Sequence, residues 1–491
     1  MLLRHLPAHV DLVARCALRR LDRAALRPHR TLLRLKRRPS APPFKPRFAA
    51  SMNRILALLL VSFAGPALLS AQEQPIGGAW TLEAAVAQAR AANPDALIAQ
   101  ARVSAARAAQ EEAGSAGLPR VDLRATYYQT NNPMQAFGAI LSQGTFDNSI
   151  DFNSPGQIDS FTAGLYARYA LYTGGRITAG KAAAAASAQA ASLSRDAVLS
   201  DLVVEVARAY FGIRQAADAV AALESALASY DENLRIGVLR EQAGQLLRSE
   251  RLNLEVQRSR TNQQLLAARH QQRLAERQFA FLLGLKPDAL VALAASDKTS
   301  DRLVAPESLQ PTQRPEYAAM QRRVETAERL ARAARGARLP SVGAFANVQT
   351  DQGWRRNGSG DSWTAGVSAE MPVFDGRETR SRIRSAEAEV AVARESLRKL
   401  QLGLALELEQ ARLKYELVRA QLDVSRQEVA QAEESARLSR ERFSAGSLLS
   451  AELIGVETRL AEARMRRSAN LASERVAVAE LRRAAGLPVF P

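Results

Sequence analysis

Four segments of the chain alternate apolar and polar residues with a period of two, which is the pattern of an amphipathic β-strand. They cover residues 121–128, 161–171, 342–348 and 363–373. The longer ones reach the length of a transmembrane β-strand, which turns one face to lipid and the other to water. A soluble amphipathic hairpin has the same pattern, so both interpretations remain open at this point. Four strands cannot close a barrel in lipid, because open edges leave backbone groups unpaired. Either they form a soluble sheet, or several chains each contribute four strands to one barrel.

The remaining pattern predicts unusually long helices. Proline is absent from residues 156–286 and from residues 373–487. We predict long helices over 176–242 and 377–444, each about 100 Å at 1.5 Å per residue, and returning helices over 247–283 and 449–485. Glycine at the end of each long helix permits the left-handed turn that stops a helix. Mostly apolar residues at alternating spacings of four and three indicate coiled-coil packing: Leu404, Leu408, Ala411, Tyr415, Val418, Leu422, Ser425, Val429, Ala432 and Ala436.

The sequence contains an internal repeat. Asn93-Pro94 matches Arg314-Pro315 at an offset of 221 residues, whereas Ala243-Gly244 matches Ala445-Gly446 at an offset of 202. We interpret the chain as a tandem duplication whose first copy has 19 additional residues (221 − 202) between its two strands. The resulting loop, residues 131–159, contains two polar, turn-forming stretches and four larger apolar residues, so a surface loop without a role stays an alternative. The stretches are Asn131-Asn132-Pro133 and Ser154-Pro155-Gly156, and the apolar residues are Met134, Phe137, Ile140 and Leu141. We expect this loop at an extracellular mouth, where the loops of outer-membrane barrels are longest.

The N-terminal region predicts export. Residues 52–71 have a short basic start, an apolar run and small residues before a polar stretch, which is the layout of a secretory signal peptide. Residues 1–51 stand in front of this signal, and we interpret them as a non-native upstream extension. A genuine basic arm or an organelle transit segment is the alternative. Residues 1–51 hold 13 of the 67 Lys and Arg residues against two acids, a net charge of +11 out of the total of +17. The remaining +6 is spread over 440 residues (491 − 51). The charge of the body therefore gives no support for nucleic-acid binding.

No enzyme is indicated by the residues that remain after the signal peptide. The only cysteine is Cys16, and His270 is the only histidine beyond residue 71. A His/Cys metal centre, a cysteine nucleophile and a histidine-based triad are therefore excluded for the mature chain. A peptidase or hydrolase would need a nucleophile and a base that the sequence lacks. We expect no catalytic, cofactor-binding or metal-binding residues.

Several short motifs, in their order and spacing, resemble the TolC-like family of outer-membrane efflux proteins. They are the opening Thr81-Leu82-Glu83-Ala84-Ala85, Asn93-Pro94, Leu118-Pro119 before the first strand, Leu171-Tyr172-Thr173-Gly174-Gly175-Arg176, and Val373-Phe374-Asp375-Gly376-Arg377 in the second copy. The resemblance covers residues 80–491. It implies a mostly helical protomer with membrane β-structure, made of residues 72–290 (first repeat), 291–313 (linker and equatorial segment) and 314–491 (second repeat).

The resemblance also implies an assembly and a function. A homotrimer would form a 12-stranded β-barrel in outer-membrane lipid and a 12-helix α-barrel in the periplasm. This duct would carry substrates from an inner-membrane transporter to the exterior, in tripartite efflux or type I secretion. A periplasmic adaptor protein would be the second partner, and no cofactor is implied. The alternative is a periplasmic coiled-coil scaffold without a pore, which explains the helices but neither the strands nor the signal peptide.

The candidate sites follow from the resemblance, residue by residue. Adaptor docking falls on the two helical turns, Ala243, Gly244, Ala445 and Gly446. The periplasmic gate falls on Glu452 and on the equivalent Glu250, which we expect Arg248 and Arg251 to neutralise. The second acidic position of the family falls on Gly455, and a basic residue that helps to lock the closed state falls on Leu448. A carboxylate in the first turn of a helix is also favoured by the helix dipole alone, so a purely structural role for Glu452 stays open.

Overall fold

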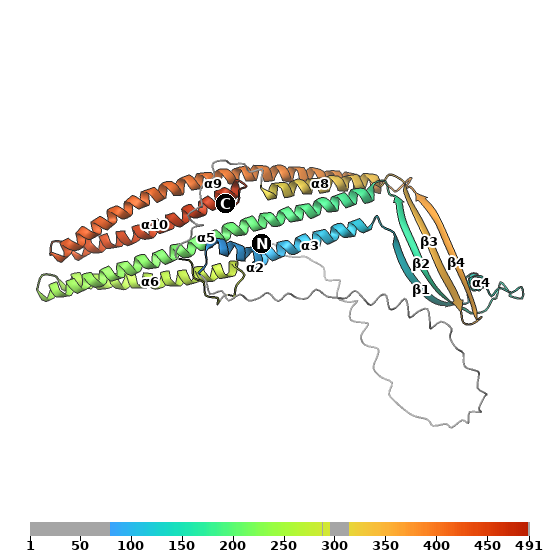
Figure 1. Ribbon diagram of the computed structural model, residues 1–491, viewed down its shortest axis with the longest axis horizontal. Coiled ribbons are helices and arrows are strands. Elements are labelled where there is room, and N and C mark those ends of the chain that lie inside the picture. The colour runs from blue at the N-terminus through green and yellow to red at the C-terminus, as the bar shows by residue number, and fades with distance from the viewer. Residues whose placement is uncertain (1–78, 287, 295–313, 490–491) are drawn as a thin grey trace, which may run out of the picture. The chain divides into compact units, whose positions relative to one another are not determined.

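The computed structural model describes residues 79–286, 288–294 and 314–489 of the chain. All of them belong to the second of two units, Gly77–Pro491. The predictions for residues 1–51 and 52–71, and for most of the linker 291–313, fall outside the described residues. Within the described ranges the chain is mostly helical, with one antiparallel sheet (Figure 1).

The sheet contains the four predicted strands in the order β1-β2-β3-β4. They are β1 (Arg120–Thr130), β2 (Ile158–Tyr172), β3 (Ser341–Gly353) and β4 (Gly358–Glu370), and every neighbouring pair is antiparallel. β2 pairs with β3, so the sheet joins the two halves of the chain. β4 ends three residues earlier than expected, because Pro372 follows closely and proline has no N–H to donate to a ladder.

The four long helices lie within one residue of their predicted bounds. They are α5 (Arg176–Gln242), α6 (Arg248–Leu282), α9 (Glu378–Ser444) and α10 (Ser450–Ala484). α5 packs against α6, α9 packs against α10, and α10 also contacts α5 (Figure 1). α5 and α9 have 67 residues each, and α6 and α10 have 35 each. None of the helices in the described ranges is long and apolar enough to cross a membrane.

Four shorter helices were not predicted. α2 (Leu82–Ala92), α3 (Pro94–Ser115) and α8 (Pro315–Gly336) lie beside the long helices, and α4 (Pro133–Ser142) lies inside the segment expected to be a loop. In three of them a proline occupies the first helical turn, where its missing N–H costs nothing. Each strand is joined to a helix at the same end of the sheet: α3 precedes β1, α5 follows β2, α8 precedes β3 and α9 follows β4.

The largest apolar core lies where α2, α5, α6 and α10 meet. Its fully buried members include Leu82, Val206, Tyr210, Phe279 and Leu283. The sheet lies outside this core, and most of the residues of β1 and β4 are exposed. This separation leaves the sheet available for contacts outside the chain.

Candidate functional site: a two-faced sheet and paired helical turns

One face of the sheet is apolar and uncovered. The register pairs Leu123 with Leu165, Leu165 with Val348, and Val348 with Trp363, so these side chains share a face. Leu123 is 75% exposed, Trp363 is 76% exposed and Val367, two pairs further along, is 66% exposed. Contiguous exposed apolar surface of this kind marks contact with a membrane or with another protein.

The opposite face of the sheet is polar and is linked by side-chain hydrogen bonds. Tyr166 donates its hydroxyl proton to Oε1 of Gln349 at 3.1 Å. Thr162 donates to Oδ1 of Asp351 at 2.5 Å. Nearer the helices, Arg168 lies 3.3 Å from Asp122 in an ion pair. Such an arrangement fits a surface in contact with water. One face of the sheet is therefore suited to lipid and the other to water.

Aromatic residues gather at the end of the sheet that is remote from the helices. The ring of Trp354, in the turn between β3 and β4, lies 5.8 Å from Tyr127 and 5.9 Å from Phe161 between centroids. All three residues are at or next to the apolar face. Amphipathic rings of this kind are enriched where a membrane meets water.

The two predicted helical turns have the same backbone structure. After α5, the Gln245 N–H donates to the Arg240 carbonyl at 2.8 Å and the Gly244 N–H to the Glu241 carbonyl at 3.0 Å. Gly244 has a φ of +70°, as this type of helix end requires. The same two bonds recur after α9, where Gly446 has a φ of +84°. Ala243 and Ala445 cap the two helices, and all four turn residues are exposed.

Arg240 joins the two turns. Its Nη1 donates to the Phe443 carbonyl at 2.8 Å, its Nη2 donates to the Gln245 carbonyl at 3.2 Å, and its guanidinium lies 5.1 Å from the centroid of the Phe443 ring. Beneath it lies an apolar cluster formed by Leu246, Leu254, Phe443, Leu448 and Leu453. Leu448, where the resembled family has a basic residue, is therefore buried between the turns. The sequence did not indicate that Arg240 connects them.

Glu250 and Glu452 occupy equivalent places in the first turns of α6 and α10. Glu452 is exposed and Glu250 is half-buried, and neither carboxylate has an ion pair or hydrogen bond among the described residues. The expected neutralisation of Glu250 by Arg251 is not seen. Arg251 instead pairs with Glu241 at 2.5 Å and with Glu255.

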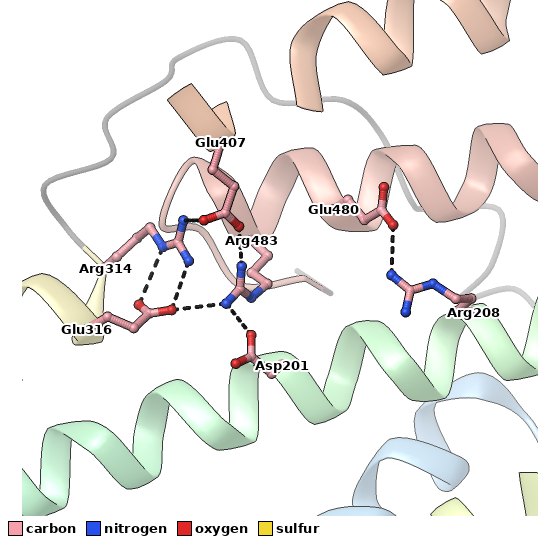
Figure 2. Close-up of polar contacts among 7 residues, drawn as sticks. All are labelled: Asp201, Arg208, Arg314, Glu316, Glu407, Glu480 and Arg483. Atoms are coloured by element: carbon pink, nitrogen blue, oxygen red, sulfur yellow. Dashed lines mark hydrogen bonds and ion pairs between the residues drawn. The ribbon is translucent and has the colours of Figure 1, made fainter. Parts of the chain in front are cut away.

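A network of charged side chains, which the sequence did not indicate, connects α5, α8, α9 and α10 (Figure 2). Arg314, whose side chain is only 2% exposed, lies 2.8 Å from Glu316 and 2.7 Å from Glu407. Arg483 contacts the same two carboxylates and also Asp201. Two arginines thus share three acids. Close by, Arg208 pairs with Glu480 at 2.8 Å.

The pKa values of two acids in this network are shifted in opposite directions. Desolvation raises the pKa of the Asp201 carboxyl, and the charge of Arg483 only partly offsets it. Burial also acts to raise the pKa of Glu316. There the hydrogen bonds from Arg314 and the charges of both arginines outweigh it, so the pKa is lowered. Among the described residues, no group of three or more His, Cys, Asp or Glu side chains could hold a metal ion.

The fold and the two-faced sheet define a class of membrane protein in which a small membrane sheet is joined to long paired helices. The chain belongs to the outer membrane efflux protein family, whose model matches residues 85–285 and 309–487. The resemblance inferred from the motifs is thereby confirmed. The chain is accordingly an outer-membrane protein with a periplasmic portion.

Three similar proteins illustrate the extent of the match. The outer membrane efflux protein BepC of Brucella suis biovar 1 (strain 1330) is 26% identical over 227 residues, which are 46% of this chain and only 50% of BepC. The outer membrane protein VceC of Vibrio cholerae has the same fold at 18% identity, with a TM-score of 0.69 over 83% of this chain and 96% of VceC. The Campylobacter jejuni CmeC outer membrane channel gives a TM-score of 0.70 at 17% identity, over 82% and 85%.

Proposed function

We propose that the chain is the outer-membrane exit duct of a tripartite efflux or type I secretion system, passing substrates from an inner-membrane transporter to the exterior. The observation that carries this proposal is the sheet, with an exposed apolar face opposite a hydrogen-bonded polar face. Each outer strand, β1 and β4, has a neighbour on one side only within the described residues. Edge strands in lipid need partners, and copies of the same sheet supply them if three chains close a 12-stranded barrel.

The helical part then forms the periplasmic duct. The equal lengths of α5 and α9, and of α6 and α10, support the interpretation of the chain as a tandem duplication. Three copies contribute twelve helical segments to one α-barrel about 100 Å long, at 1.5 Å per residue. All four strands connect to helices at one end, so the helices lie on one side of the membrane. We assign that side to the periplasm, as the family implies, and the opposite end of the sheet to the exterior. The duct itself needs no catalytic group or cofactor.

The far ends of the helices are the sites for partners and for the gate. The turns at Gly244 and Gly446 are exposed and joined by Arg240, which gives a periplasmic adaptor protein one composite surface to dock on. Glu452, and Glu250 at the equivalent place in α6, would line the periplasmic opening. A threefold axis would bring three unpaired Glu452 carboxylates together, and such a ring attracts cations.

Oligomeric state and conduction test the proposal. The protein extracted in detergent is expected to be a trimer whose electrophoretic mobility changes on heating, and to conduct ions in planar bilayers. A monodisperse monomer with a stable folded sheet and no conductance would refute the duct. It would favour the soluble coiled-coil scaffold instead.

A further inference from the structure

The segment between β1 and β2, residues 131–157, folds back onto the end of the sheet, and we call it the α4 lobe (Figure 1). Its helix buries Ala136, Ala139 and Ile140 against Ile158, the first residue of β2. Gln143, at the end of the helix, is 1% exposed and donates its Nε2 to the Asp159 carbonyl at 2.8 Å. The lobe is therefore docked on the sheet through a small core and a buried hydrogen bond.

The α4 lobe covers the polar face of the sheet rather than the apolar one. Gly360 is paired with Asp351, which lies on the polar face, and Gly353 lies two residues further along the same face of β3. A Cβ at Gly360 would overlap the Ser142 carbonyl, and a Cβ at Gly353 would overlap the Gln143 side chain. Glycine at both positions therefore leaves the space that the lobe occupies on this face.

Exposure along the strands agrees with this placement. Ser160 and Asp351, on the polar face near the loops, are 2% and 5% exposed. Thr364, on the same face but nearer the helices, is exposed. On the apolar face the side chain of Trp363 remains 76% exposed. The lobe thus covers the outer part of one face only.

We propose that the α4 lobe lies inside the outer end of the duct and limits the size of the solutes that pass through it. This inference rests on the proposed function, because the polar face lines the lumen only if the apolar face meets lipid. The lobe presents an aromatic group in which the half-buried Phe137 ring lies 4.8 Å from Phe152 and 5.9 Å from Phe146, both of which are exposed. Met134, in the same lobe, is 81% exposed. An apolar constriction of this kind resists the passage of bulky hydrated solutes.

Thiol accessibility on intact cells tests the position of the lobe. Cys16 is the chain's only cysteine, so Cys16→Ser provides a background without thiols. Thr364→Cys reports on the lumen below the lobe, Ala365→Cys reports on the apolar face, and Arg355→Cys reports on the exposed outer turn. Each is labelled with a small charged methanethiosulfonate and with a long polyethylene-glycol maleimide. The lobe is then removed by replacing residues 131–157 with Asn-Gly, because Thr130 and Ile158 are directly paired and a two-residue turn can join them.

With the lobe present, we expect Thr364→Cys to react with the small reagent and hardly at all with the large one. Removal of the lobe should raise the rate of the large reagent at least about tenfold, with no change at Arg355→Cys. Equal rates for the large reagent with and without the lobe would overturn this inference alone. A small reagent that labels Ala365→Cys but not Thr364→Cys would mean that the faces are reversed, and would refute the proposed duct as well.

A single substitution keeps the test decisive if the shortened chain does not assemble. Gly360→Ala should displace the lobe, because the new Cβ overlaps the Ser142 carbonyl, and so should admit the large reagent to Thr364→Cys. Gly343→Ala is the matched control, since a Cβ there meets its nearest atom at an ordinary 3.7 Å. The inference fails if Gly360→Ala and Gly343→Ala give the same labelling rate.

Discussion

Loss of Arg314 should loosen the junction of α8, α9 and α10 without unfolding the protein. In Arg314→Met the side chain stays long and unbranched, but Glu316 and Glu407 lose their shared guanidinium. Arg483 remains in contact with both carboxylates, and it also pairs with Asp201. The perturbation therefore leaves three acids around one arginine.

The magnitude follows from the burial of each partner. Removing one partner of a fully buried ion pair costs about 3–5 kcal/mol. The Arg314 side chain is 2% exposed, but those of Glu316 and Glu407 are 21% and 40% exposed, so water can partly solvate the acids left behind. We therefore expect about 2–3 kcal/mol of local destabilisation. The control Arg335→Met breaks a pair with Glu387 whose members are 59% and 46% exposed, and should cost under about 1 kcal/mol.

Amide hydrogen exchange measures this local stability directly. A loss of 2–3 kcal/mol corresponds to roughly 30- to 150-fold faster exchange in the first turns of α8 and the last turns of α10. Because the pKa of Glu316 is lowered in the folded protein, its contribution is present above its unfolded pKa and is lost as the pH falls through the folded one. The difference between Arg314→Met and wild type should therefore shrink in acid. Exchange rates no faster than those of Arg335→Met at neutral pH would refute the reasoning.

Two further predictions concern the ends of the long helices. Glu452→Gln should lower cation selectivity and weaken block by divalent cations in planar bilayers while the trimer stays intact; unchanged conduction with a loss of stability would assign Glu452 to the helix dipole instead. Arg240→Ala should remove the guanidinium hydrogen bonds to the Phe443 and Gln245 carbonyls, at a cost of about 1–2 kcal/mol, and should reduce export in a resistance assay. Arg235→Ala, which breaks only an exposed pair with Glu232, should leave export unchanged.

The long helices could be predicted to within a residue because their signals are local. Both helical regions lack proline, the heptad spacing of residues 404–436 marks the second long helix, and Gly244 and Gly446 end the two long ones. The α4 helix was missed because Asn132-Pro133 was interpreted as a turn. In fact Asn132 caps the helix, accepting hydrogen bonds from the backbone N–H groups of Met134 and Gln135. The apolar spacing of Ala136 and Ile140 is the signal that could have revealed it.

The charged network and the Arg240 contacts between the two helical turns could not be predicted, because their partners are brought together only by the fold. Arg314 and Glu407 are 93 residues apart in the sequence, and Arg240 and Phe443 are 203 apart. No spacing rule connects such positions. The sequence does show that Arg314 stands where the first copy has Asn93, and both residues are buried helix caps before a proline. That difference marks a position where the two copies have diverged, but it does not indicate which acids pair with Arg314.

The hydrogen bond from Arg240 to the Phe443 carbonyl, which joins the two turns, also restricts how the chain can change in length during evolution. Seven residues added to α9 alone would carry its turn about 10 Å past the other, at 1.5 Å per residue. Arg240 would then lose the Phe443 carbonyl, and the leucines beneath it would be out of register. A version of this protein suited to a wider periplasm must therefore lengthen both arms of both hairpins together, in steps that preserve the heptad. A duplicated gene can acquire such changes only as matched insertions, so length variants should differ by the same number of residues in each half.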